Sequence, residues 1–292
     1  MNLALLNKMK FLIVGDLHGN VPNIYFKDFD AIIAPGDFCS DAPRKYMFQA
    51  MKERLQNPKS KVQWYDIVGK EKAKDMIKQS LKDGRKILEK LNSLDIPIYI
   101  VPGNKDWTAY KESKWSLERI NHYKTLVKGL ENLIDVNNKL VNAEEFQFIG
   151  HGITSSPEYP QYKEDLKRYN KKELAKIKKD YTKDLAKTSS IFEKSSKPVI
   201  FLTHNVPFNT PIDKIVNKES PKNGYHYGSL IARKIIDKYQ PLVCIGGHMH
   251  EHFAKCKIDK TTAINTGYGS YVNILLELDG NKIKKVEFYK GK

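Results

Sequence analysis

Short apolar runs recur along the first 250 residues of the chain, and each run is too short to form a helix. They are rich in β-branched and aliphatic residues, a composition that favours buried strands. The runs are FLIV at 11–14, AIIA at 31–34, IPIYIV at 96–101, PVIFLT at 198–203 and LVCIG at 242–246. We therefore predict five buried strands at these positions.

Between several of these runs, apolar residues recur at every third or fourth position, as in amphipathic helices. This spacing covers residues 77–91 and residues 230–236, and Ser229 is a residue type that commonly caps a helix. The charged stretch 162–193 has the same spacing, and its lysines alternate with acidic residues, which favours a solvated helix face. Strands that alternate with helices predict an α/β domain.

After residue 255 the pattern changes to a period of two, without intervening helices. The segments are TTAIN, YVNILLEL and KIKKVEFY, and Asp279-Gly280 lies between the last two as in a hairpin. We predict that the chain ends in an antiparallel meander. No repeat or composition break marks a boundary, so residues 1–292 are expected to form a single domain. Residues 1–9 are expected to be a disordered extension, and 162–193 a charged helical insertion.

The formal charge of +16 would attract a polyanion, whether nucleic acid, a membrane surface or a phosphorylated small molecule. Most of the 50 basic residues are lysines, whereas arginine is the residue usually used for bidentate recognition of phosphates and bases. This composition favours a generally basic surface over a dedicated nucleic-acid face. No apolar stretch approaches the roughly 20 residues needed to span a bilayer, and we expect no membrane partner.

The three cysteines, Cys39, Cys244 and Cys256, are an odd number without metal-binding spacing. They suggest neither a disulfide framework nor a thiolate zinc site. This usage fits a reducing compartment, so we expect a cytoplasmic protein.

Each of the five apolar runs is followed directly by side chains that can bind a metal. The segments are Gly15-Asp16-Leu17-His18, Gly36-Asp37, Gly103-Asn104-Lys105-Asp106, Thr203-His204-Asn205 and Gly247-His248-Met249-His250. Ligands of open α/β sheets bind beyond the carboxyl ends of the strands, so these five ends are expected to meet around one crevice. In an extended segment residues i and i+2 point to the same side. Asp16 with His18, and His248 with His250, are therefore each expected to present two donors to one place.

Taken together and in this order, the motifs D-x-H, G-D, G-N-x-D, H and G-H-x-H resemble those of the calcineurin-like metallophosphoesterase superfamily, from about residue 10 to 270. The stretch HNVPFNTPIDK, followed by YGS and GHMHEH, looks most like the bacterial and archaeal cyclic-nucleotide-phosphodiesterase-like branch. The resemblance implies a four-layer α/β/β/α sandwich of two mixed sheets flanked by helices, with two bound divalent metal ions.

Position by position, the resemblance implies two metal-binding sets that share one bridging carboxylate. Asp16, His18 and His250 would hold one metal, Asn104, His204 and His248 the other, and Asp37 would bridge them. Oxygen and imidazole donors without thiolate suit manganese, iron, zinc or nickel. Two such ions lower the pKa of a bound water from about 15.7 toward 7 and neutralise phosphoryl oxygens. The implied function is hydrolysis of phosphate esters, as a phosphodiesterase or phosphatase acting on a small molecule or nucleotide.

The chain departs from the family at the residue after the metal-binding Asn104. Many members have a histidine there that protonates the leaving group, and a following acidic residue orients it, whereas this chain has Lys105 and then Asp106. A lysine of pKa about 10.4 is a poor proton donor at neutral pH. Either Lys105 contacts the substrate and stabilises the leaving group, or it is solvated and His18 or another histidine is the donor.

Asn104, Lys105, Asp106 and His18 are thus the catalytic candidates. Three further histidines, His151, His226 and His252, are candidates for substrate contacts, because His151 follows another apolar run and the other two flank the last ligand motifs.

Two other functions remain open at this point. The charge of +16 suggests a nuclease of the same fold. The lysine in place of the expected acid suggests a non-catalytic scaffold that uses the metals for stability or partner docking. The sequence predicts no oligomeric state.

Overall fold

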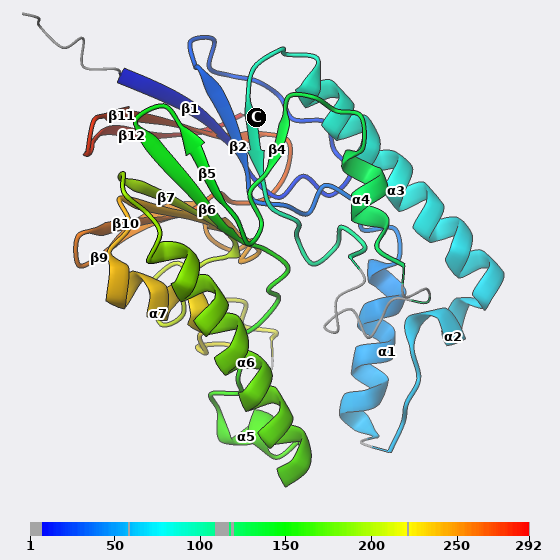
Figure 1. Cartoon of the computed structure of the whole chain (residues 1–292). Helices are drawn as coiled ribbons and strands as arrows, with labels where there is room; N and C mark the ends of the chain where they lie inside the picture. Colours follow the sequence, from blue (N-terminus) through cyan, green and yellow to red (C-terminus); the bar gives the residue numbers. More distant parts are fainter. Residues whose placement is uncertain (1–7, 58, 109–116, 118–119, 221, 292) are drawn as a thin grey trace, which may run out of the picture.

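The computed structural model describes residues 8–57, 59–108, 117, 120–220 and 222–291. Two six-stranded mixed sheets lie face to face, and helices cover their outer faces (Figure 1). From edge to edge the first sheet contains β12 (Lys282–Lys290), β11 (Val272–Asp279), β1 (Lys8–Val14), β2 (Ala31–Ala34), β3 (Ile98–Ile100) and β4 (Leu133–Asp135). The second contains β5 (Leu140–Ala143), β6 (Phe146–His151), β7 (Val199–Asn205), β8 (Val243–Gly247), β10 (Thr261–Asn265) and β9 (Ala254–Ile258). The predicted four-layer fold is confirmed.

All five predicted buried strands are present, as β1, β2, β3, β7 and β8. Strand β1 begins at Lys8, so the last two residues of the extension expected at 1–9 belong to the strand. Residues 1–7 lie outside the described residues.

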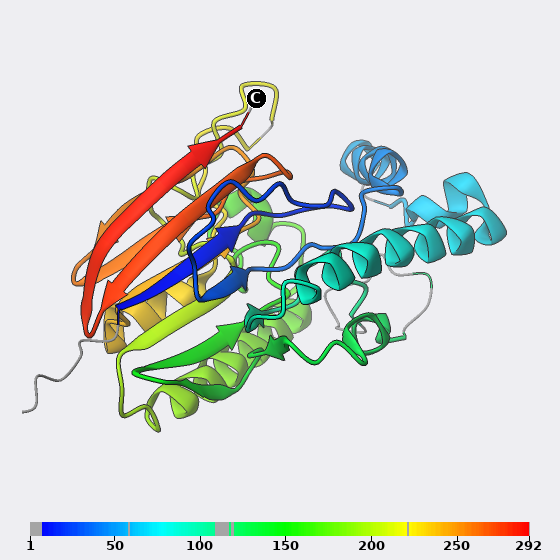
Figure 2. The ribbon, with the colours of Figure 1, turned by 90° about the horizontal axis from the view of Figure 1, so that it is seen from above.

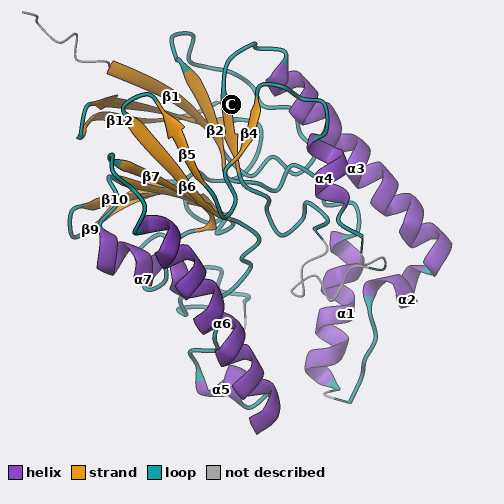
Figure 3. Cartoon of the chain, in the orientation of Figure 1, coloured by secondary structure: helices purple, strands orange, loops and turns teal. Residues whose placement is uncertain are grey.

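Helices lie on both sides of the pair of sheets (Figure 3). On the side of the first sheet are α1 (Arg44–Gln56), α2 (Trp64–Val68), α3 (Lys70–Asn92) and α4 (His122–Val127), and on the other side are α5 (Lys163–Leu166), α6 (Lys171–Phe192) and α7 (Leu230–Tyr239). The helix predicted at 162–193 is present as α5 and α6, and Asn170 caps α6 by accepting a hydrogen bond from Glu173 N. Ser229 caps α7 as predicted.

The strands are apolar throughout because both of their faces are buried. Phe11 of β1 points into the space between the sheets, where its ring centroid lies 5.9 Å from that of Phe148. Its neighbour Leu12 points the other way and packs in a cluster with Leu88 of α3. On the far side Phe201 of β7 packs in a cluster that includes residues of α6 and α7.

The end of the chain differs from the predicted meander. The hairpin of β11 and β12 is confirmed, but β11 pairs antiparallel with β1 in the first sheet. Strand β10 belongs to the second sheet, where it pairs parallel with β8 and antiparallel with β9. A period of two identifies a strand but not its neighbour, so the local pattern could not distinguish these pairings.

The parallel pairs set the place of the site. Strands β1, β2 and β3 are parallel neighbours in one sheet, as β7 and β8 are in the other. Parallel neighbours end at the same edge of a sheet, so the five motif-bearing ends gather at common edges. Viewed from above, α1, α2 and the first part of α3 extend beyond the sheets as an arm (Figure 2). None of the helices in the described ranges has both the length and the apolar character needed to cross a membrane.

Candidate metal centre

One group of donor atoms joins the ends of β1, β2 and β8. His18 Nε2 lies 3.1 Å from His250 Nε2 and 3.4 Å from Asp37 Oδ2. His250 Nε2 also lies 3.2 Å from Asp16 Oδ2. Asp16, His18 and Asp37 are buried, and a ligand atom from each of the four residues lies within 4.8 Å of the others.

A second group shares Asp37 with the first. His204 Nε2 lies 2.8 Å from Asn104 Oδ1 and 3.6 Å from Asp37 Oδ1. The rings of His204 and His248 have centroids 5.2 Å apart, and Asp37, His204 and His248 each offer a ligand atom within 4.8 Å of the others. All seven residues of the two sets implied by the resemblance therefore lie in these groups.

The hydrogen bonding of the second group fits a cation. His204 Nδ1 lies 2.9 Å from the carbonyl oxygen of Pro35, to which it donates, so the lone pair of a neutral ring is on Nε2. That lone pair faces the Asn104 amide oxygen and the Asp37 carboxylate, so three acceptors converge. In the first group Asp16 Oδ1 is buried and has no hydrogen-bond partner among the described residues. Such a convergence of acceptors favours a bound positive charge.

The spacing of the donors fits as well. Two ligands bonded to one zinc-like ion at about 2.1 Å in tetrahedral geometry lie about 3.4 Å apart. The separations of 3.1, 3.2 and 3.4 Å in the first group are close to this value. Both groups therefore suit divalent metals, in a dinuclear arrangement typical of imidazole and carboxylate ligands.

Burial and neighbouring charges shift the pKa values of several residues at the site. Burial alone would lower the pKa of His18, but the close contact with Asp41 and the charge of Asp37 outweigh burial and raise the pKa to about 8. Burial alone would raise the pKa of Asp16, yet His250 and His204 hold it below its usual value. Burial, with His204 nearby, lowers the pKa of His248 to about 3. Asp16 thus keeps its negative charge in a buried place.

Asp41 is a contributing residue that the sequence reasoning missed. Its Oδ1 lies 3.0 Å from His18 Nδ1, on the side of the ring opposite the donor group. Carboxylates in this position orient a histidine ligand and raise its basicity. The available signal was an acidic residue four positions after Asp37, but nothing in that spacing shows that it reaches His18.

Three ligand candidates have left-handed backbone conformations. The φ angles are 45° at His18, 55° at Asp37 and 65° at His248. Such conformations cost about 1–3 kcal/mol each and concentrate at functional sites. They also correct one prediction, because His248 and His250 do not present their donors to one place and instead belong to different groups. The prediction assumed an extended segment, which the left-handed turn at His248 interrupts.

Asp106 ties the loops after β2 and β3 together. This buried carboxylate accepts hydrogen bonds from the backbone N–H groups of Asp37 at 2.8 Å, Phe38 at 2.7 Å, Cys39 at 3.1 Å and Gly103 at 2.7 Å. Burial and the charge of Asp37 raise its pKa to about 6. A Cβ at Gly103 would lie 2.1 Å from Asp37 Oδ1, so only glycine fits there. Asp106 therefore orients Asp37, which belongs to both metal groups.

Lys105 lies between α1 and the loops that Asp106 ties together. Its backbone N–H donates to Asp37 Oδ1 at 2.7 Å, and its Nζ lies 3.5 Å from Met47 Sδ of α1. Burial would raise the pKa of Asp41, but His18 and, after it, the ammonium charge of Lys105 outweigh burial and lower the pKa to about 2. Lys105 is thus close to the site and supports its electrostatics.

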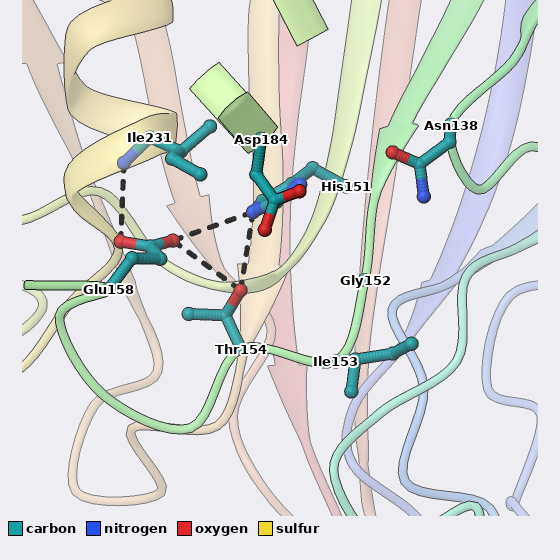
Figure 4. Close-up of a pocket in the computed structure, with 8 residues that line it drawn as sticks. All are labelled: Asn138, His151, Gly152, Ile153, Thr154, Glu158, Asp184 and Ile231. Carbon is teal, nitrogen blue, oxygen red and sulfur yellow. Dashed lines mark hydrogen bonds and ion pairs between the residues drawn. The ribbon is translucent and has the colours of Figure 1, made fainter. Parts of the chain in front are cut away.

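His151 faces a small pocket behind the loop that follows β6. The pocket is lined by Asn138, His151, Gly152, Ile153, Thr154, Glu158, Asp184 and Ile231 (Figure 4). His151 Nε2 lies 3.3 Å from Thr154 Oγ1 and 3.4 Å from Glu158 Oε1. Glu158 in turn accepts hydrogen bonds from the first backbone N–H groups of α7, at Leu230 and Ile231.

The same loop touches the metal groups at one point. His248 Nε2 donates to the carbonyl oxygen of Ser155 at 3.0 Å, which leaves the lone pair of that ring on Nδ1. Ile153 has a φ of 72°, which is unusual for a β-branched residue and indicates that its surroundings hold the loop in place. The loop therefore orients His248.

The other two histidines each have a protein partner. His226 Nδ1 lies 2.7 Å from Asp213 Oδ1, and His252 Nε2 lies 2.6 Å from the carbonyl oxygen of Lys214. Both contacts secure the long segment between β7 and α7. Contact of either histidine with a substrate stays a prediction.

Comparison with known proteins gives a family and a fold. The family model for calcineurin-like phosphoesterases matches residues 9–252. One crystal structure, 16% identical, superposes with a TM-score of 0.61 and covers 97% of this chain and 100% of its own. The crystal structure of TT1561 of Thermus thermophilus, 13% identical, has a TM-score of 0.54 and covers 97% of this chain and 99% of its own. No curated protein was found to match the sequence.

Proposed function

This chain belongs to the calcineurin-like phosphoesterase family, and from that premise we propose that it is a dinuclear-metal-dependent hydrolase of phosphate esters. The observation that carries the proposal is the pair of donor groups that share the buried Asp37. Members of this family are typically metal-dependent hydrolases.

Asp16, His18 and His250 would hold one metal, Asn104, His204 and His248 the other, and Asp37 both. When bound, two dications supply Lewis acidity toward phosphoryl oxygens and lower the pKa of a water. The chain's own residues prepare the site. Pro35 and Ser155 set which nitrogens of His204 and His248 are free, and Asp41 orients His18.

The position of Lys105 supports an electrostatic role. The ammonium lies beside Met47 of α1 and acts on Asp41, so it adds positive charge at the edge of the site, where it would stabilise a departing alkoxide or phenoxide. A charged lysine supports a leaving anion without giving up a proton, which suits substrates with good leaving groups. We propose no proton donor beyond the histidines of the site.

The substrate class we propose is a small phosphoester or nucleotide, in keeping with the cyclic-nucleotide-phosphodiesterase-like motifs. Manganese, iron, zinc and nickel all suit the donor set. A cytoplasmic location fits the free cysteines, two of which are buried.

Metal-free protein reloaded separately with each of the four metals tests the function. Turnover of bis-p-nitrophenyl phosphate or p-nitrophenyl phosphate is expected, and no turnover with any metal would contradict the proposal. Loss of residues that only orient metal ligands costs about 10–100-fold, so Asp37→Asn should cost at least roughly 100-fold. Asp28 is exposed, so Asp28→Asn is the matched control and should hydrolyse the esters as fast as the unmodified protein does.

A nuclease of the same fold is the second candidate, supported by the charge of +16. It predicts retention on DNA or RNA that weakens steeply with salt. Hydrolysis of small esters with a salt-independent KM, and no retention on nucleic acid, would exclude it. A non-catalytic scaffold instead predicts that Asp37→Asn leaves the protein's function unchanged.

A further inference from the structure

Helix α1 presents an apolar stripe to solvent. Phe48, Met51 and Leu55 are spaced three and four residues apart, so they lie on one face of the helix. Their exposed fractions are 63%, 41% and 44%, respectively. Single exposed apolar residues are common, but three in register on one helix form a surface that suits a partner.

Positive charges border this stripe at one end and along one side. At 3.6 residues per turn, Arg44 lies in line with the stripe and Lys45 and Lys52 lie along one side of it. All three side chains are exposed. The acidic residue of the helix, Glu53, lies on the opposite face. The buried Ala50 marks the side that packs on the protein.

Helix α1 starts near the metal groups and extends away from the sheets. Helix α1 begins three residues after Asp41, which contacts His18, and Met47 contacts Lys105. Figures 1 and 2 both show α1 within the arm that extends beyond the sheets, next to α2. The exposed stripe is thus carried on a part of the chain that projects from the sheets.

We propose that α1 binds the surface of an anionic lipid bilayer, with Phe48, Met51 and Leu55 inserted into the interface and the flanking cations at the level of the headgroups. An apolar face bordered by lysine and arginine, with the acidic residue on the far side, is the pattern of interfacial helices. The lipid headgroups supply the negative charge that the cations match. This departs from the expectation of no membrane partner, which rested on the lack of a spanning stretch, because an interfacial helix lies on the bilayer without crossing it. It goes beyond the proposed function, and does not depend on it, because binding requires no catalysis.

A second copy of the chain fits this face less well. Two copies that met through α1 about a twofold axis would bring the same patch together. Arg44, Lys45 and Lys52 of each would then lie among those of the other, and the like charges would repel. A bilayer carries the opposite charge and presents no such conflict.

Vesicle co-sedimentation tests the proposal with the full chain. Vesicles of phosphatidylcholine with roughly one third phosphatidylglycerol are expected to bind the protein, and pure phosphatidylcholine vesicles to bind it much less. The combined variant Phe48→Ser, Met51→Ser and Leu55→Ser should lower the partition coefficient at least about tenfold. Lys45→Gln with Lys52→Gln should also weaken binding. So should salt, because the Debye length falls from about 10 Å at 0.1 M to about 3 Å at 1 M.

The matched control replaces three exposed apolar residues elsewhere, Ile24→Ser, Val216→Ser and Tyr289→Ser, whose exposed fractions are 37%, 51% and 45%. It should bind vesicles as the unmodified protein does. Equal loss in both triple variants, or no binding to anionic vesicles, would overturn the proposal. A concentration-dependent dimer that the α1 variant abolishes and the control variant does not would also overturn it. So would a melting temperature of the α1 variant, measured without vesicles, that is lower than that of the unmodified protein.

Discussion

Asp106→Asn is expected to loosen the metal centre without touching a metal ligand. In the native protein Asp106 Oδ1 accepts from Phe38 N and Cys39 N, and Oδ2 accepts from Asp37 N and Gly103 N. Asparagine keeps one of these oxygens and replaces the other by an NH₂ group. That group would face two backbone N–H donors, so two hydrogen bonds are lost and two buried donors are left unsatisfied.

The size of the effect follows from this count. A hydrogen bond to a charged group contributes about 1.5–3 kcal/mol, so two lost bonds cost about 3–6 kcal/mol. Repulsion between Asp106 and Asp37, one cause of the raised pKa of Asp106, offsets part of this cost in the metal-free protein. A cation bound at Asp37 would remove that repulsion. The loss of stability should therefore be larger with metal than without it.

The assay compares urea unfolding with and without bound metal, together with the metal content of the protein. Asp213→Asn is the matched control, because Asp213 is also fully buried and accepts from the backbone N–H groups of Asn209, Thr210 and Gly228. Both variants should lose stability, but only Asp106→Asn should lose metal affinity, by about 10–100-fold.

Two results would refute the reasoning. If Asp106→Asn changed the unfolding free energy by less than about 1 kcal/mol, the four backbone hydrogen bonds would not be what holds the loops after β2 and β3 together. If both variants lost metal affinity equally, the effect would reflect general destabilisation and not the orientation of Asp37.

Three further predictions test separate parts of the structure. Lys105→Met, which keeps the stem but removes the charge, should slow hydrolysis most for esters with poor leaving groups, and equal slowing for all leaving groups would contradict the electrostatic role. Burial would raise the pKa of Asp165, but the Tyr227 hydroxyl and Lys222 outweigh it and lower the pKa. Ionised Asp165 therefore stabilises the folded state above about pH 4, and this stabilisation is lost as the pH falls. The unfolding free energies of Asp165→Asn and the unmodified protein should differ at pH 6 and converge toward pH 3. Burial raises the pKa of Cys244 to about 12, so iodoacetamide at pH 8 should leave this thiol unmodified until urea unfolds the protein, as mass spectrometry would show.

The strands and the order of the ligand motifs could be predicted because both are local. AIIA at 31–34 is buried on both faces, so its composition alone identifies β2, and Asp37 follows it within three residues. Parallel pairing then brings such ends together. What the sequence alone could not provide was the detailed geometry. The left-handed conformations of His18, Asp37 and His248 depend on hydrogen bonds between separate loops, such as His18 N to Asp37 O at 2.8 Å.

The residues that orient the ligands were the harder part to predict. Ser155 acts through a backbone carbonyl, which every residue has, so its side chain gives no signal. Asp41 is an ordinary carboxylate in a turn until the fold places it against His18. A histidine is a stronger candidate for a functional role than most residue types, yet His151 contacts Glu158 beside the first turn of α7. Residue type predicted which donor side chains gather at the strand ends, but not the contacts that orient them.

Helix α1 shows the same limit for a surface. Apolar residues occur on both of its sides, since Tyr46, Met47 and Ala50 pack on the protein while Phe48 and Leu55 are exposed. Apolar residues on one face of a helix give a periodic sequence pattern, and apolar residues on two faces weaken that pattern. Only the packing on α2 shows which face is already covered. The uncovered face carries Phe48, Met51 and Leu55 with cations beside them, so the proposal of a lipid-binding surface rests on the fold and not on the sequence pattern.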